Sequence, residues 1–251
     1  MKLILSPTKT MGAVFKGIGA SKNLALDHPK FEAEAQTLVQ AMAPLDQATL
    51  KKLFKTSDAL TQKTYDMIRE FGTAKETPAM FAFRGDAFKT LDPDSFTHEH
   101  VMFAQEHLRI FSGLYGVVCP LDRIKPYRLD FNTPLKIDNK GLKPFWKKKL
   151  ISYFETFLKP DETLLNLASG EYADVLSSHA LKKRMITLQF KEESKGKLKT
   201  IPIRSKQARG LFARYIIMNQ VKNPLELKNT KIEGYTYKDS LSSNREWFFI
   251  R

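Results

Sequence analysis

Three short polar clusters, each directly after an apolar stretch, are the parts of this sequence best suited to chemistry. The first comprises residues 6–10 (Ser-Pro-Thr-Lys-Thr), the second residues 84–86 (Arg-Gly-Asp), and the third residues 166–172, which include Ser169 and Glu171. Turns at the ends of strands present such groups on a rigid support, where binding and catalytic residues concentrate. Each cluster alone is also an ordinary turn, but together they predict a polar cleft.

A basic helix face is the next candidate. In a helix expected over residues 205–221, Lys206 lies opposite the apolar stripe and is flanked by Arg209 and Arg214. Gly210 falls between Lys206 and Arg214, and a glycine inside a helix costs about 1 kcal/mol. Something therefore approaches this face closely, either a phosphate backbone or a neighbouring helix.

A glycine-bounded turn at residues 112–116 (Ser-Gly-Leu-Tyr-Gly) follows an expected amphipathic helix. Its exposed backbone N–H groups would suit the phosphate grip of a helix-hairpin-helix unit, which reads no bases. The two glycines are three residues apart rather than the usual two, and Pro120 shortens any second helix. An ordinary buried turn is the alternative.

Motifs of the common enzyme classes do not occur in the sequence. It contains no GxxxxGK phosphate loop, GxGxxG dinucleotide motif, GxSxG nucleophile turn or HExxH zinc motif. His98 and His100 are two residues apart at a helix start and face different ways, which disfavours a metal site. The single cysteine, Cys119, excludes a disulfide scaffold. We expect no metal site, no iron sequestration and no cofactor.

Composition and charge point to a folded, basic protein. The 251 residues are 42% apolar and include 18 Phe, enough for a packed core, and the net charge is +14. Residues 1–140 hold 19 basic and 16 acidic side chains, a net +3, whereas residues 141–251 hold 22 and 11, a net +11. This asymmetry fits either a polyanion-binding face or a solvated surface. No apolar run approaches the ~18 residues of a membrane span, so we expect a cytoplasmic protein without membrane contact, most simply a monomer.

The elements that must position these groups alternate irregularly along the chain. Apolar runs predict strands at residues 3–5, 80–83, 163–167, 235–237 and 247–250, and a hairpin of residues 185–191 and 197–204 around Lys195-Gly196. Helical periodicity predicts helices at residues 31–42, 45–54, 57–71, 95–111, 142–158 and 205–221. The irregular order favours an α+β fold with a mixed sheet and one domain, residues 1–251.

Several ordered blocks carry a resemblance to a known family. They are LILSPTKT at residues 3–10, FRGD at 83–86, FAQEHLR at 103–109, SGLYGVVCPLD at 112–122, NLASGEY at 166–172 and KQARGLFAR at 206–214. In these blocks the chain resembles the YaaA family of bacterial peroxide-stress proteins. It departs from the family pattern at Arg84, where the family has lysine, at Cys119, where arginine is common, and at Arg245, where a turn glycine is usual.

The resemblance implies a compact mixed α/β fold with a positively charged cleft and a helix-hairpin-helix element. It also implies DNA binding and a role in the response to hydrogen peroxide, in which lower free intracellular iron limits oxidative damage.

Our leading hypothesis is a DNA-binding stress protein that contacts phosphates without base specificity, on duplex or locally unpaired DNA. Tyr115 and Tyr127 would stack on unpaired bases, a contact worth about 1–3 kcal/mol each. The predicted DNA-binding residues are Lys9, Arg84, Arg109, Gly113, Tyr115, Gly116, Tyr127, Arg128, Ser169, Lys206, Arg209 and Arg214.

The alternative is an enzyme, of lyase or glycosylase type, acting on a nucleotide or damaged base in the same cleft. Lys9 would be a Schiff-base nucleophile, and Asp86, Asp122 and Glu171 would be candidate acids or bases. The mixture of carboxylate, ammonium, amide and hydroxyl groups in the three clusters is the reason to keep this hypothesis.

Overall fold

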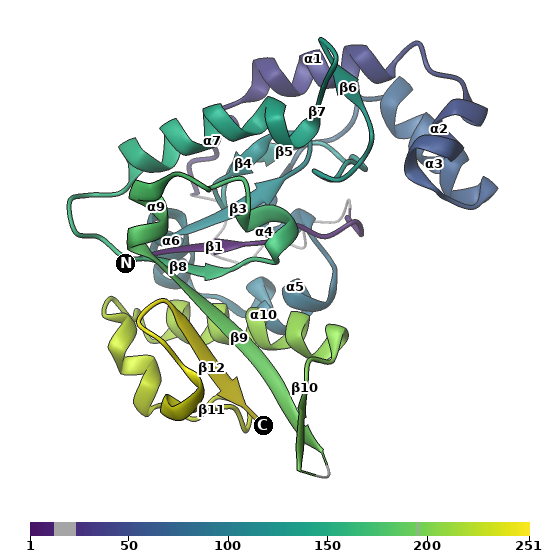
Figure 1. The fold of residues 1–251 in the computed structure, drawn as a ribbon. Coiled ribbons are helices and arrows are strands. Elements are labelled where there is room, and N and C mark those ends of the chain that lie inside the picture. The colour runs from purple at the N-terminus through teal and green to yellow at the C-terminus, as the bar shows by residue number, and fades with distance from the viewer. Residues whose placement is uncertain (13–23, 195) are drawn as a thin grey trace.

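A sheet of mostly parallel strands forms the centre of the computed structural model, which describes residues 1–12, 24–194 and 196–251 (Figure 1). Its strands are β1 Lys2–Leu5, β3 Leu108–Ser112, β4 Gly116–Val118, β8 Leu164–Leu167, β9 Met185–Ser194, β10 Lys197–Lys199, β11 Thr236–Tyr237 and β12 Glu246–Ile250. The order across the sheet is β11-β12-β9-β8-β1-β3-β4, with β10 paired to β9 off this path. Neighbours from β12 to β3 run parallel, and β11 and β4 pair antiparallel at the edges.

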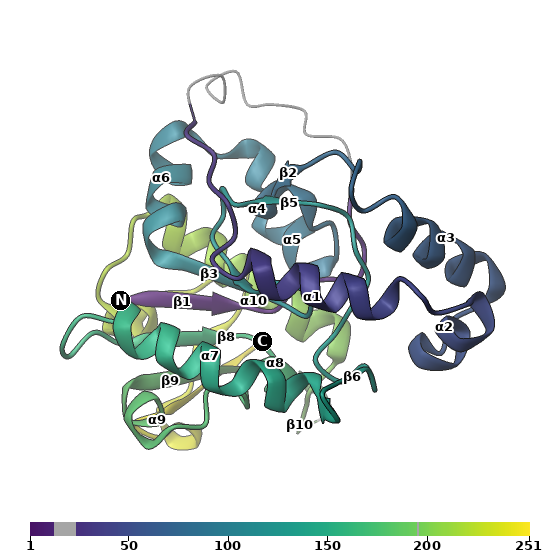
Figure 2. The same ribbon diagram turned by 90° about the horizontal axis from the view of Figure 1, so that it is seen from above.

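Helices cover both faces of this sheet. In Figures 1 and 2, α1 and α7 lie over one face, α10 lies under the other, and α2 and α3 project to one side. The helices are α1 Glu32–Met42, α2 Gln47–Phe54, α3 Asp58–Arg69, α4 Ala79–Ala82, α5 Asp86–Leu91, α6 His98–His107, α7 Leu142–Phe157, α8 Gly170–Ala173, α9 His179–Arg184 and α10 Pro202–Met218. Two small ladders complete the fold: β2 Thr77–Pro78 with β5 Arg123–Ile124, and β6 Lys136–Ile137 with β7 Lys140–Gly141. Within the described ranges, no helix combines the length and apolarity that a bilayer crossing requires.

The mixed α/β architecture predicted from the sequence is confirmed, although the sheet is more regularly parallel than an α+β class implies. The buried apolar side chains of the described residues form one continuous cluster. The central strand β1 is almost fully enclosed, with Leu3, Ile4 and Leu5 each at most 1% exposed. Such a strand, buried on both faces, appears in sequence as a continuous apolar run.

Two predicted elements are wrong for the same physical reason. Residues 80–83 were expected as a strand, but residues 79–82 form the short helix α4. Residues 108–111 were expected to continue a helix, but after α6 the chain turns into β3, which pairs with β1. Both segments are buried on all sides, so their apolar pattern carries no periodicity to separate helix from strand.

The hairpin of β9 and β10 is confirmed, with Ser194 opposite Lys197, while Lys195 lies outside the described residues. The strand expected to reach residue 204 ends at residue 199, because α10 begins at Pro202.

Gly210 explains how α10 sits against the body of the protein. A Cβ at this position would lie 1.9 Å from the Ala87 carbonyl oxygen and 2.2 Å from Thr90 Oγ1. The Thr90 hydroxyl also donates to the Gln207 carbonyl oxygen at 2.8 Å. Of the two alternatives that the sequence left open, a neighbouring helix is correct, and it is α5. The close contact holds the start of α5 beside the first half of α10.

Candidate functional site

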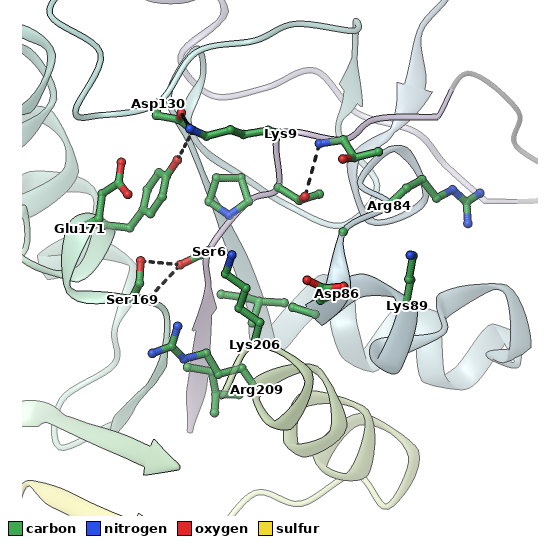
Figure 3. Close-up of a pocket in the computed structure, with 18 residues that line it drawn as sticks. Ser6, Lys9, Arg84, Asp86, Lys89, Asp130, Ser169, Glu171, Lys206 and Arg209 are labelled. Atoms are coloured by element: carbon green, nitrogen blue, oxygen red, sulfur yellow. Dashed lines mark hydrogen bonds and ion pairs between the residues drawn. The ribbon is translucent and has the colours of Figure 1, made fainter. Parts of the chain in front are cut away.

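The carboxyl ends of β1 and β8 open into a pocket of about 670 Å³ (Figure 3). The two strands are adjacent and parallel, with Leu5 opposite Leu167, so the segments that follow them begin side by side. Ligands of open parallel sheets bind at such carboxyl ends. Residues 84–87 from the start of α5, and residues from α10, complete the pocket wall.

This pocket gathers residues of the three polar clusters, together with Lys206 and Arg209, two of the three residues of the basic helix face. The predicted site residues that line it are Lys9, Arg84, Asp86, Ser169, Glu171, Lys206 and Arg209. Thr8 and Tyr172 of the polar clusters also line it, and the structure adds Lys89 and Asp130, which lie outside the clusters. Lys89 lies three residues after Asp86, on the same face of α5. Because the sequence did not predict a helix at these residues, this spacing could not identify Lys89 as a site residue.

Direct contacts fix the clusters against one another. The Ser169 backbone N–H donates to Ser6 Oγ at 2.8 Å, and the two hydroxyl oxygens are 3.3 Å apart. A Cβ at Gly85 would lie 2.0 Å from Thr8 Oγ1, so only glycine lets the second cluster approach the first this closely. Segments far apart in the sequence therefore form one rigid wall.

One side of the pocket is acidic and internally paired. Lys9 Nζ lies 2.7 Å from Asp130 Oδ2, and the Tyr172 hydroxyl donates to Asp130 Oδ1 at 2.9 Å. Burial, and next the charge of Asp130, raise the pKa of the Glu171 carboxyl. Figure 3 shows Lys9, Asp130 and Glu171 on one side of the Ser6–Ser169 contact.

The opposite side holds three cations, Lys89, Lys206 and Arg209, together with the carboxylate of Asp86, and two of these cations lack a counter-ion among the described residues. Lys206 and Arg209 make no hydrogen bond or ion pair with any residue in the described ranges, and Arg209 Nε is buried without a partner there. Burial lowers the pKa of the Arg209 guanidinium. Arg84 instead pairs with Asp94 at 2.8 Å and points away from the pocket centre. A buried guanidinium without a counter-ion is unfavourable unless an anion satisfies it.

The structure contradicts the predicted inclusion of Arg109 and Arg214 in the same groove. Arg109 is 8% exposed, donates to the Tyr153 hydroxyl at 2.7 Å and packs on the Phe157 ring. Arg214 donates to backbone oxygens at the end of α5 and to Ser95 Oγ at 2.7 Å. The Arg109 guanidinium therefore connects β3 to α7, and the Arg214 guanidinium connects α10 to the end of α5. Arg128 also lies outside the pocket and borders a small separate cavity of about 10 Å³.

The predicted helix-hairpin-helix unit is also wrong at residues 112–116, because this segment is the buried turn between strands β3 and β4. A Cβ at Gly113 would lie 2.0 Å from the Leu129 carbonyl oxygen, and a Cβ at Gly116 would lie 2.6 Å from the Trp146 ring. The rings of Tyr115 and Tyr127 pack edge to face in the core, 3% and 8% exposed. None of these four residues can reach DNA in this structure.

Asp122 was a candidate acid or base, but it is buried outside the pocket. It is 3% exposed, and its Oδ2 accepts a hydrogen bond from the Cys119 N–H at 2.8 Å. Burial raises its pKa from 3.8 to about 6, although this hydrogen bond and the charge of Arg109 oppose the shift. Burial likewise raises the pKa of the Cys119 thiol to about 11, which makes the thiol unreactive.

Asp122→Asn is expected to stabilise the protein at pH 7.5 but not at pH 4.5. The folded-state pKa lies above the unfolded one, so the folded state holds the extra proton between about pH 4 and pH 6. Wild-type stability therefore falls as the pH rises through this window, by on the order of 2–3 kcal/mol. The side-chain amide of asparagine keeps an oxygen that accepts the Cys119 N–H hydrogen bond, but it carries no charge. Urea unfolding of both proteins at the two pH values measures the difference, and an equal effect at both would contradict the assignment.

Comparison with known proteins gives the family. The sequence pattern of the family described as "Peroxide stress protein YaaA" matches residues 1–241. The chain belongs to the YaaA peroxide-stress family. A UPF0246 protein of Desulforapulum autotrophicum is 41% identical over 254 residues, covering 100% of this chain and 99% of that protein. A UPF0246 protein of Crocosphaera subtropica is 38% identical and one of Fusobacterium nucleatum 33%, each over 100% of this chain and at least 99% of its own length. The YaaA resemblance drawn from the sequence blocks is thus confirmed over nearly the full chain.

Proposed function

We propose that this YaaA-family protein binds DNA during peroxide stress through phosphate contacts in the pocket at the ends of β1 and β8, without base specificity. In this proposal the bound protein limits iron-driven oxidative damage.

One observation carries the proposal: Lys206 and Arg209 lie together on α10, face the pocket, and have no counter-ion among the described residues. Lys89 from α5 adds a third cation of the same kind to the lining. Arginine and lysine side chains of this kind supply most phosphate contacts in protein–DNA complexes. Lys9 and Arg84 are already paired with Asp130 and Asp94 and would have to exchange partners to join them.

Fewer residues contact phosphate in this proposal than in the hypothesis based on the sequence. Arg109, Arg214 and the residue 112–116 turn are structural, so the phosphate contacts come from one pocket and not from a groove across the molecule. Fewer contacts mean weaker dependence on salt.

Titration of a fluorescent 20-base-pair duplex over a range of NaCl concentrations measures how many phosphates the protein contacts. Three unpaired cations give a log–log slope of about −2.7 on duplex DNA, at −0.9 per phosphate, and about −4.5 if Lys9 and Arg84 take part. A flat salt response would refute phosphate binding.

The enzyme hypothesis keeps one specific support, the Glu171 carboxyl, whose raised pKa suits a general acid. Lys9 is a poorer Schiff-base candidate, since it is 59% exposed and paired with a carboxylate rather than held in an apolar pocket. Repeating the titration with oligonucleotides that carry a damaged base, and analysing the recovered strands, separates the two functions. Intact strands support binding alone, whereas released base would support an enzyme.

A further inference from the structure

A second pocket of about 650 Å³ adjoins the first and has no role in the function proposed above. Its polar side chains include Lys182 on α9, Thr187 and Gln189 on β9, and Arg245 beside β12. Its volume lies in the range of small-ligand sites, about 300–1,000 Å³. The first pocket, at about 670 Å³, is of matching size.

The two pockets are separated by a single stretch of chain. At the end of β8 and in the two residues after it, residues 167 and 169 line the first pocket, and residues 166 and 168 line the second. This alternation follows from the two-residue period of an extended chain, and it ends at residue 170, where α8 begins. Among the residues that the structure describes, Arg209 alone lines both pockets, and it lies on α10.

The guanidinium of Arg209 is therefore placed where a ligand occupying both pockets would pass. Its Nε–H is buried and has no partner among the described residues. Arginine stays charged in proteins and presents donors that match two phosphate oxygens. A negative group between the two pockets would satisfy the side chain.

Building on the proposed DNA-binding function, we propose that the two pockets hold two consecutive nucleosides of an unpaired DNA strand, with their shared phosphodiester on Arg209. Paired bases cannot enter separate pockets, so the strand must be single or locally opened. In the second pocket the Thr187 hydroxyl oxygen accepts a hydrogen bond from the Asn166 side-chain amide at 3.1 Å, and the Gln189 amide donates to Glu246 at 2.8 Å, so these polar groups are held in place. Arg245 is similarly fixed by donating to the Lys182 carbonyl oxygen at 2.8 Å.

The test compares thymidine, the dinucleotide TpT and the methylphosphonate form of TpT, whose linkage is uncharged, each as a competitor of a labelled oligothymidylate. We expect TpT to bind about ten-fold or more tightly than its methylphosphonate, because only TpT presents a charged phosphate to Arg209. Thymidine, which fills one pocket at most, should bind more weakly than either dinucleotide. Arg209→Gln should remove the difference between TpT and its methylphosphonate.

Each other outcome has a definite meaning. Equal binding of TpT and its methylphosphonate by the wild-type protein, with oligothymidylate and duplex DNA still bound, would overturn the two-pocket site and leave the proposed function intact. Absence of binding to every DNA would remove both. Because the methylphosphonate comparison uses the wild-type protein, it holds even if Arg209→Gln does not fold.

Discussion

Replacing Lys206 and Arg209 together by glutamate is expected to lower the affinity for DNA by about 10²–10⁴-fold at low salt. Each lost contact with a phosphate is worth about 1.5–3 kcal/mol, and the new carboxylates add repulsion. Neither side chain pairs with another described residue, so little native structure depends on them. Fluorescence anisotropy with a labelled oligonucleotide measures the change.

The matched control is Lys147→Glu with Lys148→Glu, which changes the net charge by the same amount. Both lysines are exposed on α7, over the face of the sheet opposite α10 (Figure 1). The control should weaken binding only slightly, through long-range charge. Equal losses in the two double variants would show that net charge, and not this pocket, attracts DNA.

Gly116→Ala is expected to destabilise the protein by about 3 kcal/mol without changing the DNA affinity of the folded form. Gly116 has a φ of +68°, which costs an alanine about 1–2 kcal/mol. The added methyl group would also lie 2.6 Å from the buried Trp146 ring, and overpacking of this kind costs about 1–3 kcal/mol. For a chain of this size the melting temperature should fall by roughly 6–12 °C.

Gly72→Ala is the control for that measurement, because a Cβ at Gly72 would have no neighbour within 4 Å. Its stability should match the wild type within about 0.5 kcal/mol. If the Gly116→Ala protein has normal stability but has lost DNA binding, the result would instead support the phosphate-binding turn predicted from the sequence.

Elements with clear periodicity or a clear turn were predictable from the sequence. The amphipathic helices α1, α7 and α10 and the buried strands β1 and β8 lie close to their predicted positions. Segments buried on every side were not predictable, because β3 and α4 have no polar face to set a period. The burial of Tyr115 and Tyr127 follows from packing between distant segments, which residue types alone do not reveal.

Some features of the candidate site were likewise predictable from the sequence, and others were not. The meeting of the first and third clusters was predictable, because polar clusters that follow parallel strands lie at one edge of a sheet. The second cluster reaches the same pocket after helix α4, which was expected to be a strand. The pairing of Lys9 with Asp130 was not predictable, since the two residues are 121 positions apart and no motif links them. Arg209 and Arg214 show most clearly what the sequence could not predict. Both lie on α10, but only Arg209 lines the pocket, whereas Arg214 donates to Ser95.

The claim on which this account depends is that Arg209 receives a DNA phosphate, and the ¹H–¹⁵Nε resonance of its side chain reports this directly. Arg209→Lys identifies the signal by its loss. We expect titration with oligothymidylate to shift this resonance and to slow its hydrogen exchange, as a new partner reaches the buried Nε–H. DNA binding that leaves the Arg209 signal unmoved would contradict the account.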